Sequence, residues 1–373
     1  MQRQNWSFSS NAPFCRMTGS SGLLRLFRIL TLFESQSLNM VTQKNTSLLS
    51  YNSFHFDVNA SELVSVKSVN ELQELLHTKT PLLVLGGGSN ILLTRNVEGL
   101  VVKIDILGIE EVKEDNTHIY VRVGAGENWH SFVEYTMKRN WGGLENLSLI
   151  PGNVGAAPIQ NIGAYGVELK DSFYELEAYD RKEKKVYSFA VNDCRFAYRD
   201  SIFKSAEKGR YIILNVTFVL RKTPVLHTSY GAIREELKIM GVKSPTIQDI
   251  SAAVIKIRRS KLPDPADIGN AGSFFKNPVV DQSKFLSLSS KYAEMPAYPH
   301  EDQSVKLAAG WLIEQCGWKG YRKGDAGVHK DQALVLVNYG KATGREILDL
   351  SEKINLSVTK KFGIHLDSEV NIF

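Results

Sequence analysis

The chain of 373 residues lacks most of the features that assign a protein to a specialised class. Its three cysteines, Cys15, Cys194 and Cys316, are odd in number and far apart, which argues against a disulfide framework or a cysteine-rich zinc site and favours a reducing compartment. No window contains the roughly 18 uninterrupted apolar residues of a membrane-spanning helix. A formal net charge of +5 is too dilute over this length to predict a nucleic-acid partner. With 43% hydrophobic and 23% charged residues, the composition predicts a globular protein of two or three domains.

Several common catalytic motifs are also missing. The eight histidines form no HExxH pattern, and His130 with Glu134 is too small a set, so we expect no metal site. The glycines at 86–88 are not followed by Gly-Lys-Ser/Thr and do not have the dinucleotide-binding spacing. No GxSxG elbow surrounds Ser273, which leaves a serine-hydrolase function unsupported.

The first 39 residues differ from the rest of the chain. Residues 1–39 carry four arginines and one acid, whereas residues 40–373 carry 41 basic and 39 acidic residues, a net charge of +2. We therefore expect 1–39 to be a poorly ordered extension, or translated sequence upstream of a start at Met40. An organelle transit peptide is the alternative.

The body of the chain mixes strand and helix patterns without a regular βαβ alternation, which predicts an α+β fold. A capping box at Ser68–Glu71 predicts a helix through His77. Arg181–Lys185 is a basic turn that we interpret as solvated surface. The expected strands are 61–67, 119–123, several within 172–220, and 365–373; the expected helices are 129–138, 246–259, 304–316 and 344–362.

Two loops are candidate ligand sites. The three glycines and two polar residues of Gly86–Asn90 form a nest that suits a phosphate or pyrophosphate, although a tight structural turn also explains them. Residues 151–168 are rich in glycine and uncharged amides, including Gln160 and Asn161, and these groups suit a neutral heteroaromatic ring. A purely structural loop is the alternative.

Three further residues are candidates for chemistry. Arg199 suits a carboxylate ligand because its planar fork binds both oxygens, but an ion pair with Asp200 or another nearby acid explains it as well. Ser273 follows a turn bracketed by glycines and precedes two phenylalanines that would exclude water, so it is a candidate proton donor. Glu369 is by default a surface carboxylate.

Taken together, these segments closely resemble the UDP-N-acetylenolpyruvoylglucosamine reductase family, also called UDP-N-acetylmuramate dehydrogenases. The resemblance runs in order from about residue 48 to the C-terminus, and the segment around Tyr298 resembles the subtype with a tyrosine-bearing substrate loop. The motifs that carry it are LGGGSN (85–90), VGAGENWH (123–130), GLENLSLIPGNVGAAPIQNIGAYGVEL (143–169), CRFAYRDSIF (194–203), KLPDPADIGNAGSFFKNPVV (261–280), SVKLAAGWLIEQCG (304–317) and HKDQALVLVN (329–338).

The resemblance implies a two-part FAD-binding module of the vanillyl-alcohol-oxidase type and a C-terminal α+β substrate-binding domain. It implies FAD-binding subdomains at 40–107 and 108–258, a substrate-binding domain at 259–363, and a strand at 364–373 that returns to the FAD module. The implied activity is the NADPH-dependent reduction of UDP-N-acetyl-enolpyruvoylglucosamine to UDP-N-acetylmuramate for peptidoglycan. We expect a cytoplasmic, monomeric enzyme with a UDP-sugar as its only partner besides the cofactors.

The resemblance also implies roles for individual residues. Hydride passes from flavin N5 to C3 of the enolpyruvyl group, Ser273 protonates C2, and Arg199 with Glu369 stabilises the developing charge, the carboxyl group only if it carries or shares a proton. The implied FAD-binding residues are Gly86, Gly87, Gly88, Ser89, Asn90, Gln160, Asn161, Gly163, Tyr165 and Gly166. The implied substrate-binding residues are Tyr198, Tyr230, Lys261, Asn277, Tyr298 and Gln332.

Two departures from the family pattern and two rival functions remain. His55 stands where relatives often have glycine, and Ala156-Ala157 stands where they can carry two serines that bond FAD. A different flavin oxidase on the same module is one alternative, but the motifs at 261–332 argue against it. A non-catalytic nucleotide-sugar binder is the other, and the joint presence of Arg199, Ser273 and Glu369 argues against that.

Overall fold

The first sheet begins at Thr42, shortly after the arginine-rich segment 1–39 ends. The computed structural model describes residues 40–300 and 303–373, so the expectations for 1–39 lie outside the described residues. The strand order is β1-β2-β5-β3, with β1 antiparallel to β2 and the other pairs parallel. The strands are β1 Thr42–Ser47, β2 Asn59–Val66, β3 Leu83–Leu85 and β5 Val97–Ile104.

Helix α2 (Val69–Thr78) connects β2 to β3. It starts where the sequence predicts, because the Ser68 hydroxyl accepts a hydrogen bond from the Glu71 amide (3.2 Å). Its buried Leu72 and Leu75 pack in a cluster that includes Leu214 of the second sheet. Full burial of one such leucine contributes about 1.5–3 kcal/mol, so this cluster ties the first sheet to the second.

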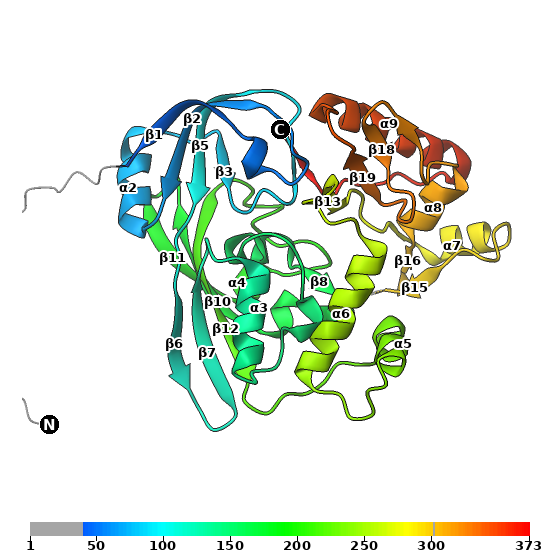
Figure 1. The fold of residues 1–373 in the computed structure, drawn as a ribbon, viewed down its shortest axis with the longest axis horizontal. Coiled ribbons are helices and arrows are strands. Elements are labelled where there is room, and N and C mark those ends of the chain that lie inside the picture. Colours follow the sequence, from blue (N-terminus) through cyan, green and yellow to red (C-terminus); the bar gives the residue numbers. More distant parts are fainter. Residues whose placement is uncertain (1–39, 301–302) are drawn as a thin grey trace, which may run out of the picture. The chain divides into compact units, whose positions relative to one another are not determined.

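The second sheet is antiparallel, in the order β11-β10-β12-β7-β6 (Figure 1). One of its faces is covered by α3 (Trp129–Lys138), whose Trp129 and Phe132 pack against Phe218. Helices α5 (Gly231–Ile239) and α6 (Ile247–Lys261) then pack together around Ile233, Ile250 and Val254. The strands are β6 Ile109–Glu114, β7 His118–Gly124, β10 Phe173–Asp180, β11 Lys185–Ala190 and β12 Tyr211–Arg221, and the short helix α4 is Val191–Cys194.

An irregular stretch at 145–171 connects α3 to β10 and carries most of the second candidate loop. It contains one-turn helices and a small hairpin, which satisfy its backbone groups although it is not a core element. Its elements are η2 Glu145–Leu147, η3 Val154–Ala156, η4 Pro158–Gln160, β8 Gly163–Ala164, β9 Val167–Glu168 and η5 Leu169–Asp171; η1, earlier in the chain, is Leu49–Tyr51.

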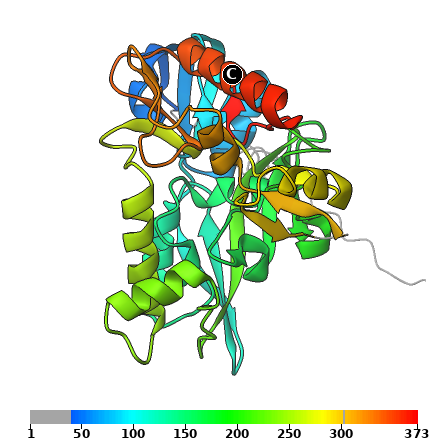
Figure 2. The ribbon, with the colours of Figure 1, turned by 90° about the vertical axis from the view of Figure 1, so that its right-hand side faces the viewer.

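The C-terminal part contains two small sheets, in the orders β13-β19-β18-β17 and β14-β16-β15. In Figures 1 and 2, α9 lies at the opposite end of the molecule from the β6–β7 hairpin. Its elements are β13 Gly269–Ser273, β14 Val279–Val280, α7 Gln282–Ser289, β15 Ala297–Pro299, β16 Val305–Leu307, α8 Ala309–Gln315, β17 Arg322–Lys323, β18 Ala326–Val328, β19 Val335–Asn338 and α9 Gly344–Phe362. The last strand, β20 (Asn371–Ile372), leaves this part and pairs in parallel with β4 (Ile91–Leu92).

The prediction of α9 is confirmed and two other predictions need correction. Helix α9 is capped by Thr343, buries the stripe of Ile347, Leu350, Ile354 and Val358, and ends at Gly363 in the left-handed region (φ 65°). The helix expected at 304–316 begins only at Ala309, because Val305–Leu307 pairs as a strand between β14 and β15. The strand expected at 365–373 is reduced to two residues, and the rest is extended chain.

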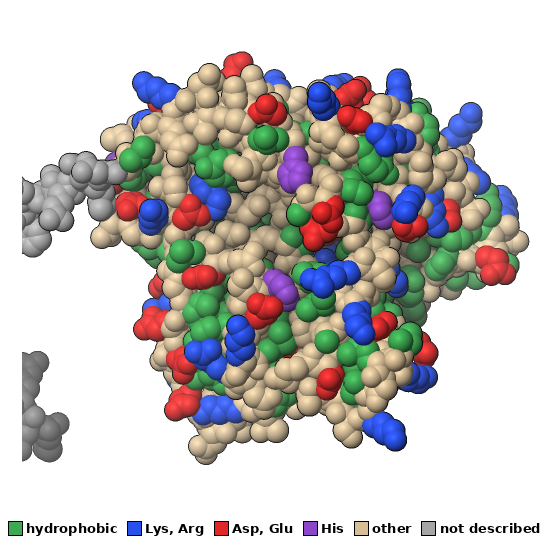
Figure 3. Space-filling view, viewed as in Figure 1, with side chains coloured by type: hydrophobic (Ala, Val, Ile, Leu, Met, Phe, Trp, Pro, Cys, Tyr) green, Lys and Arg blue, Asp and Glu red, His purple; other side chains and the backbone are tan. Residues whose placement is uncertain are grey.

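Charge on the described surface is mixed. Figure 3 shows Lys and Arg interspersed with Asp and Glu over the face that it draws, as expected from the near balance of acids and bases after residue 39. Within residues 40–300 and 303–373, no helix is long and apolar enough to cross a membrane. The subdomain boundaries inferred from the resemblance stay a prediction.

Candidate active site

The C-terminal segment carries Glu369 between two other segments of the chain. The Glu369 amide donates to the carbonyl oxygen of Phe274 (2.8 Å), and the Asn90 side chain donates to the carbonyl oxygen of Glu369 (3.2 Å). The Asn371 amide then donates to the carbonyl oxygen of Asn90 (3.1 Å). These bonds bring together the end of the first glycine loop, the end of strand β13 and the C-terminal segment.

Glu369 and Arg199 form an ion pair. Arg199 Nε lies 3.1 Å from Glu369 Oε1, and the two side chains are only 21% and 15% exposed. Arg199 Nη2 also donates to the carbonyl oxygen of Gly163 (2.5 Å). The partner expected from local sequence, Asp200, instead accepts from the Ser201 amide. The expectation that Glu369 is a surface carboxylate was therefore wrong, because backbone pairing draws its segment into the molecule.

The backbone at Arg199 is held in an unusual conformation. Its φ is 54°, in the left-handed region, which costs a non-glycine residue about 1–2 kcal/mol. The turn is closed by two backbone bonds between Ala197 and Asp200. Such strain concentrates at functional sites, and here it directs the guanidinium toward Glu369.

Ser273 is the last residue of strand β13. Gly272 before it has φ 69°, a conformation that only glycine adopts without strain, and its amide donates to the Asn270 side chain (2.9 Å). Phe274 after it is buried and donates to the carbonyl oxygen of Leu334 (2.8 Å). The carbonyl group of Phe274 also accepts from the Glu369 amide, so the backbone is held on both sides of Ser273. Ser273 is therefore one residue away from the group that binds Glu369.

The two candidate loops touch each other. Ser89 Oγ donates to the carbonyl oxygen of Pro151 (3.1 Å), and a side chain at Gly87 would meet Asn153 Oδ1 at 2.8 Å. Gly88 has φ 65° and a side chain there would overlap the carbonyl oxygen of Tyr51. Gly87 and Gly88 are thus required by packing, and Gly88 also by its conformation.

These loops fit FAD by one further observation. The Ser53 hydroxyl group is buried without a partner among the described residues, and the Ser53 amide donates to the carbonyl oxygen of Gly88 (3.1 Å). An unsatisfied buried donor beside a glycine nest suits a phosphate-bearing cofactor that supplies the acceptor. Gly86, Ser89 and the backbone amides nearby are the groups that would hold it.

Gln160 sits at the centre of a small network. Its Oε1 accepts from Asn90 Nδ2 (3.0 Å) and from Lys204 Nζ (3.1 Å), so its amide nitrogen is left to face a ligand. The pKa of Lys204 is lowered to about 8, chiefly by burial and next by nearby Lys276, while Glu369 opposes the shift. Sequence reasoning missed Lys204, although it directly follows the motif at 194–203.

Other predicted cofactor residues divide into two groups. The side chain of Asn161 is fully buried and bonds Glu168 (2.9 Å) and Ala197 (3.2 Å), which leaves chiefly its backbone for a cofactor. Tyr165 contacts another predicted position, since its ring meets that of Tyr230 edge-on at 5.5 Å, and burial raises the pKa of Tyr165. Gly163 carries the carbonyl group that accepts from Arg199, and Gly166 (φ 82°) has open space beside it.

The predicted substrate residues lie on several elements. Lys306 Nζ lies 4.3 Å from the centre of the Tyr198 ring in a cation–π contact, and burial raises the pKa of Tyr198. Asn277 accepts from the Ala309 amide (3.0 Å) and fixes the start of α8. Burial, and next the nearby Tyr298, raises the pKa of Tyr230.

The remaining predicted positions are less enclosed. Lys261 ends α6 and is exposed. Gln332 is partly buried, and its Oε1 accepts from the Leu334 amide (3.4 Å). Two further cations were missed from sequence: Lys306, and Arg258, whose Nε donates to the carbonyl oxygen of Leu149 (3.2 Å) and whose pKa burial lowers. Both belong to helix- or strand-forming segments whose pattern carries no sign of a ligand.

The His130–Glu134 pair on α3 has a structural explanation. His130 Nδ1 accepts from the Leu149 amide (3.1 Å), and burial lowers the pKa of the ring. Its Nε2 lies 3.8 Å from Glu134. Across the described ranges, no group of three or more histidine, cysteine or acidic residues is arranged to hold a metal ion.

Known proteins share this organisation. Residues 264–373 match the UDP-N-acetylenolpyruvoylglucosamine reductase C-terminal domain, and residues 60–186 match an FAD binding domain. The UDP-N-acetylenolpyruvoylglucosamine reductase of Flavobacterium johnsoniae is 49% identical over 336 residues, which cover 89% of this chain and 100% of that protein. The reductase of the same name from Amoebophilus asiaticus is 50% identical over 337 residues, 89% and 99% of the two chains.

A solved structure supports the fold. The UDP-N-acetylenolpyruvylglucosamine reductase of Thermus caldophilus matches with a TM-score of 0.63 and 24% identity, over 90% of this chain and 99% of that one. The predicted α+β architecture, with an FAD-binding module and a C-terminal domain, is confirmed. The Flavobacterium johnsoniae and Amoebophilus asiaticus relatives share about half of their residues with the chain over nearly their whole length. The chain therefore belongs to the UDP-N-acetylenolpyruvoylglucosamine reductase family and is an FAD-binding oxidoreductase of peptidoglycan precursor synthesis.

Proposed function

We propose that the chain catalyses the NADPH-dependent, FAD-mediated reduction of UDP-N-acetyl-enolpyruvoylglucosamine to UDP-N-acetylmuramate. The observation that carries the proposal is the shielded Arg199–Glu369 pair, held one hydrogen bond from the residue that follows Ser273. A non-catalytic binder does not require a strained arginine, an acid from a distant part of the same chain and a fixed serine close together. The relatives that share half of this sequence carry the name of this reductase.

FAD, once reduced by NADPH, supplies the hydride that adds to C3 of the enolpyruvyl group. Negative charge then develops on C2 and the attached carboxylate of the substrate. In our proposal the guanidinium of Arg199 faces this charge, and its preorganised N–H groups lower the barrier because they need no reorientation. Glu369 and the Gly163 carbonyl group hold the guanidinium from two sides.

Ser273 delivers a proton to C2. A serine hydroxyl group is a weak acid, but an enolate is a strong base, so the transfer is favourable once the hydride has been added. The backbone bonds on both sides of Ser273 restrict the positions that its hydroxyl group can take. The two phenylalanines that follow are buried at 1% and 3% exposure and help to exclude water.

The remaining substrate groups meet residues around this centre. Lys261 is suited to the diphosphate, because it is an exposed cation with no ion pair among the described residues. Tyr298, half exposed on β15, is suited to closing over the ligand as part of a lid. Tyr198, Tyr230, Asn277 and Gln332 supply rings and amides for the sugar and the nucleobase.

The proposal is tested by measuring the two half-reactions separately by stopped flow. NADPH reduces the bound flavin in the first, and the UDP-enolpyruvyl sugar reoxidises it in the second, much faster than oxygen does. Ser273→Ala is expected to leave the first nearly unchanged and to slow the second by about 10²–10⁴-fold, the usual contribution of a positioned proton donor. Ser287→Ala, on the exposed side of α7, is the control. Equal slowing of both half-reactions by Ser273→Ala contradicts the assigned role.

Two accompanying expectations concern the state of the protein. Burial raises the pKa of the Cys194 thiol to about 12, so it is unreactive, and Cys316 is the only other cysteine in the described ranges. We expect a monomer in a reducing, cytoplasmic environment. Light scattering of the FAD-loaded protein measures the oligomeric state directly.

A further inference from the structure

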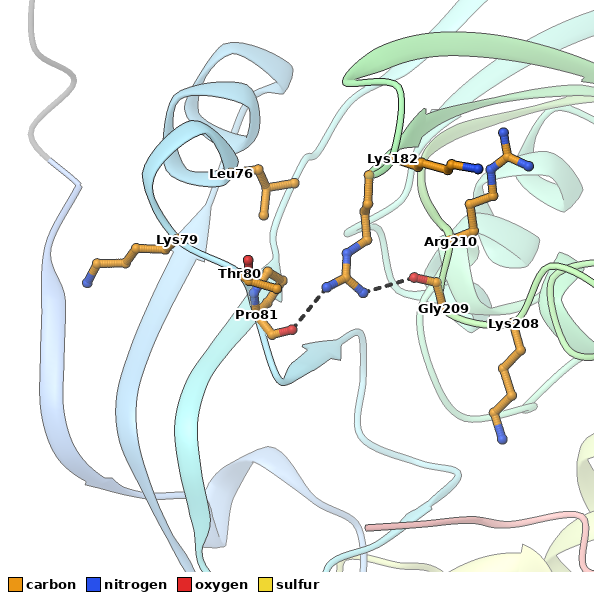
Figure 4. Close-up of a pocket in the computed structure, with 9 residues that line it drawn as sticks. Leu76, Lys79, Thr80, Pro81, Lys182, Lys208, Gly209 and Arg210 are labelled. Carbon is orange, nitrogen blue, oxygen red and sulfur yellow. Dashed lines mark hydrogen bonds between the residues drawn. The ribbon is translucent and has the colours of Figure 1, made fainter.

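A basic pocket lies where three segments of the FAD-binding module meet. It has a volume of about 510 Å³ and is bordered by the α2–β3 connection, the β10–β11 hairpin and the chain before β12 (Figure 4). We call it the basic pocket and define it by the residues that line it: Leu76, Lys79, Thr80, Pro81, Arg181, Lys182, Lys208, Gly209 and Arg210. Five of these nine residues are cationic and none is acidic.

Arg181 connects the three segments. Its Nη1 donates to the carbonyl oxygen of Gly209 (2.9 Å) and its Nη2 to that of Pro81 (3.1 Å), the two bonds dashed in Figure 4. Burial alone lowers the pKa of the guanidinium. The prediction that residues 181–185 are solvated surface is therefore wrong for Arg181. Two carbonyl groups occupy two of its five N–H donors, which leaves three for a ligand.

Two of the five cations are already neutralised. Lys79 pairs with Glu62 (2.6 Å). Arg210 pairs with the buried Asp180 (2.7 Å) and with Glu183 and Glu207 (both 3.2 Å).

The other three cations have no acid within 4.0 Å in the described part of the chain: Arg181, Lys182 and Lys208. Lys182 and Lys208 are exposed, whereas Arg181 is partly buried. A partly desolvated cation such as Arg181 is destabilising without a counter-charge, and a bound anion relieves that cost. The lining thus carries unpaired positive charge on two of its three segments, the β10–β11 hairpin and the chain before β12.

We propose that the basic pocket binds the phosphate group of a small phosphate ester. The planar fork of Arg181 matches the oxygens of a phosphate, and Lys182 and Lys208 add mobile point charges. The volume far exceeds that of a phosphate ion, and Leu76, Pro81 and the Thr80 hydroxyl group offer contacts for an organic body. The site is separate from the proposed reaction and does not depend on it.

The pocket borders the active site through one residue. Lys208 also lines a second pocket, of about 430 Å³, together with Lys204 and Glu369. The segment 204–209 therefore links the two pockets. Lys204 at its start donates to Gln160, and the carbonyl group of Gly209 at its end accepts from Arg181. A phosphate held by Arg181 and Lys208 fixes this segment, and with it the position of Lys204.

The test is calorimetric titration of the full-length, FAD-loaded protein with inorganic phosphate and with glucose 6-phosphate, at constant ionic strength. The double variant Lys182→Gln/Lys208→Gln removes two cations of the pocket. The matched control, Lys184→Gln/Lys185→Gln, removes two exposed cations from the same hairpin outside it. We expect the first to raise the Kd of both probes about tenfold or more, and the control to change it less than about twofold.

Three other outcomes contradict the site or reassign it, and the order of the two affinities tests the ester. Absence of binding to the wild type, or equal weakening in both double variants, overturns the site. Binding that is lost in Lys261→Gln but kept in Lys182→Gln/Lys208→Gln assigns the phosphate to the active site instead. Tighter binding of glucose 6-phosphate than of inorganic phosphate supports an ester, and the reverse order overturns that part of the inference.

Discussion

Replacing Glu369 by glutamine separates the structural from the catalytic role of the ion pair. The amide keeps the size of the side chain, and the two hydrogen bonds that hold this residue through its backbone, to Phe274 and from Asn90, remain. The charge facing Arg199 at 3.1 Å is lost. Breaking a fully buried pair costs about 3–5 kcal/mol, and the residual exposure of these side chains reduces this to about 2 kcal/mol of unfolding free energy.

The expected effect on rate is larger than the effect on stability. A guanidinium that is no longer held loses its preorganisation, which corresponds to about 10²–10³-fold in the second half-reaction. Flavin reduction by NADPH is expected to change only a few-fold. The assay is stopped-flow absorbance of both half-reactions, with urea unfolding of the same preparations.

A matched control makes this reasoning refutable. Asp180→Asn removes the acid from another arginine pair, with Arg210 at 2.7 Å, where the carboxylate is fully buried. It is expected to lower stability at least as much and to leave both half-reactions intact. If Glu369→Gln slows the two half-reactions equally, or Asp180→Asn slows the second one as strongly, the pair acts only through folding.

Three further predictions follow from the geometry. The pKa of Lys204 is about 8 in the folded protein, below its unfolded value, so its charge lowers the free energy of unfolding at neutral pH. This destabilisation disappears as the pH rises from about 8 to 10. In urea unfolding, Lys204→Met should be more stable than wild type by about 1–2 kcal/mol at pH 7, and the difference should vanish by about pH 10. Gly88→Ala should lower FAD stoichiometry, measured by absorbance, because its side chain would overlap Tyr51. His55→Gly should stabilise by about 0.5–1 kcal/mol in the same unfolding assay, since residue 55 has φ 58°.

Local signals predicted local structure well. The capping box at Ser68–Glu71 acts within one turn, so the start of α2 can be read from a few neighbouring residues. Thr343 caps α9 in the same way but was not singled out from the sequence. Residues 304–316 contain both a helix pattern and a short apolar run. Only the pairing of Val305–Leu307 with two other strands decides against helix there, and that pairing is not encoded nearby.

The candidate site was predictable as a set of motifs and not as a geometry. The pairing of Arg199 with Glu369 rests on backbone bonds between distant segments, and local sequence offered Asp200 instead. Lys204 and Arg258 have shifted pKa values chiefly because the fold buries them. The sequence around a charged residue does not predict that burial. His55 is the exception, because the glycine that the family resemblance implies at this position is the residue that the left-handed backbone found here favours.

The anchoring of Glu369 also constrains the order in which the enzyme is completed. Asn90 and Glu369 are 279 positions apart, so during synthesis the glycine loop and Arg199 leave the ribosome long before the acid exists. Contacts across such separations form late, because the loop-closure entropy is lost before they contribute. A nascent FAD-binding module therefore lacks the acid that pairs with Arg199, and the ion pair forms only when the last residues bring Glu369 and add β20 beside β4.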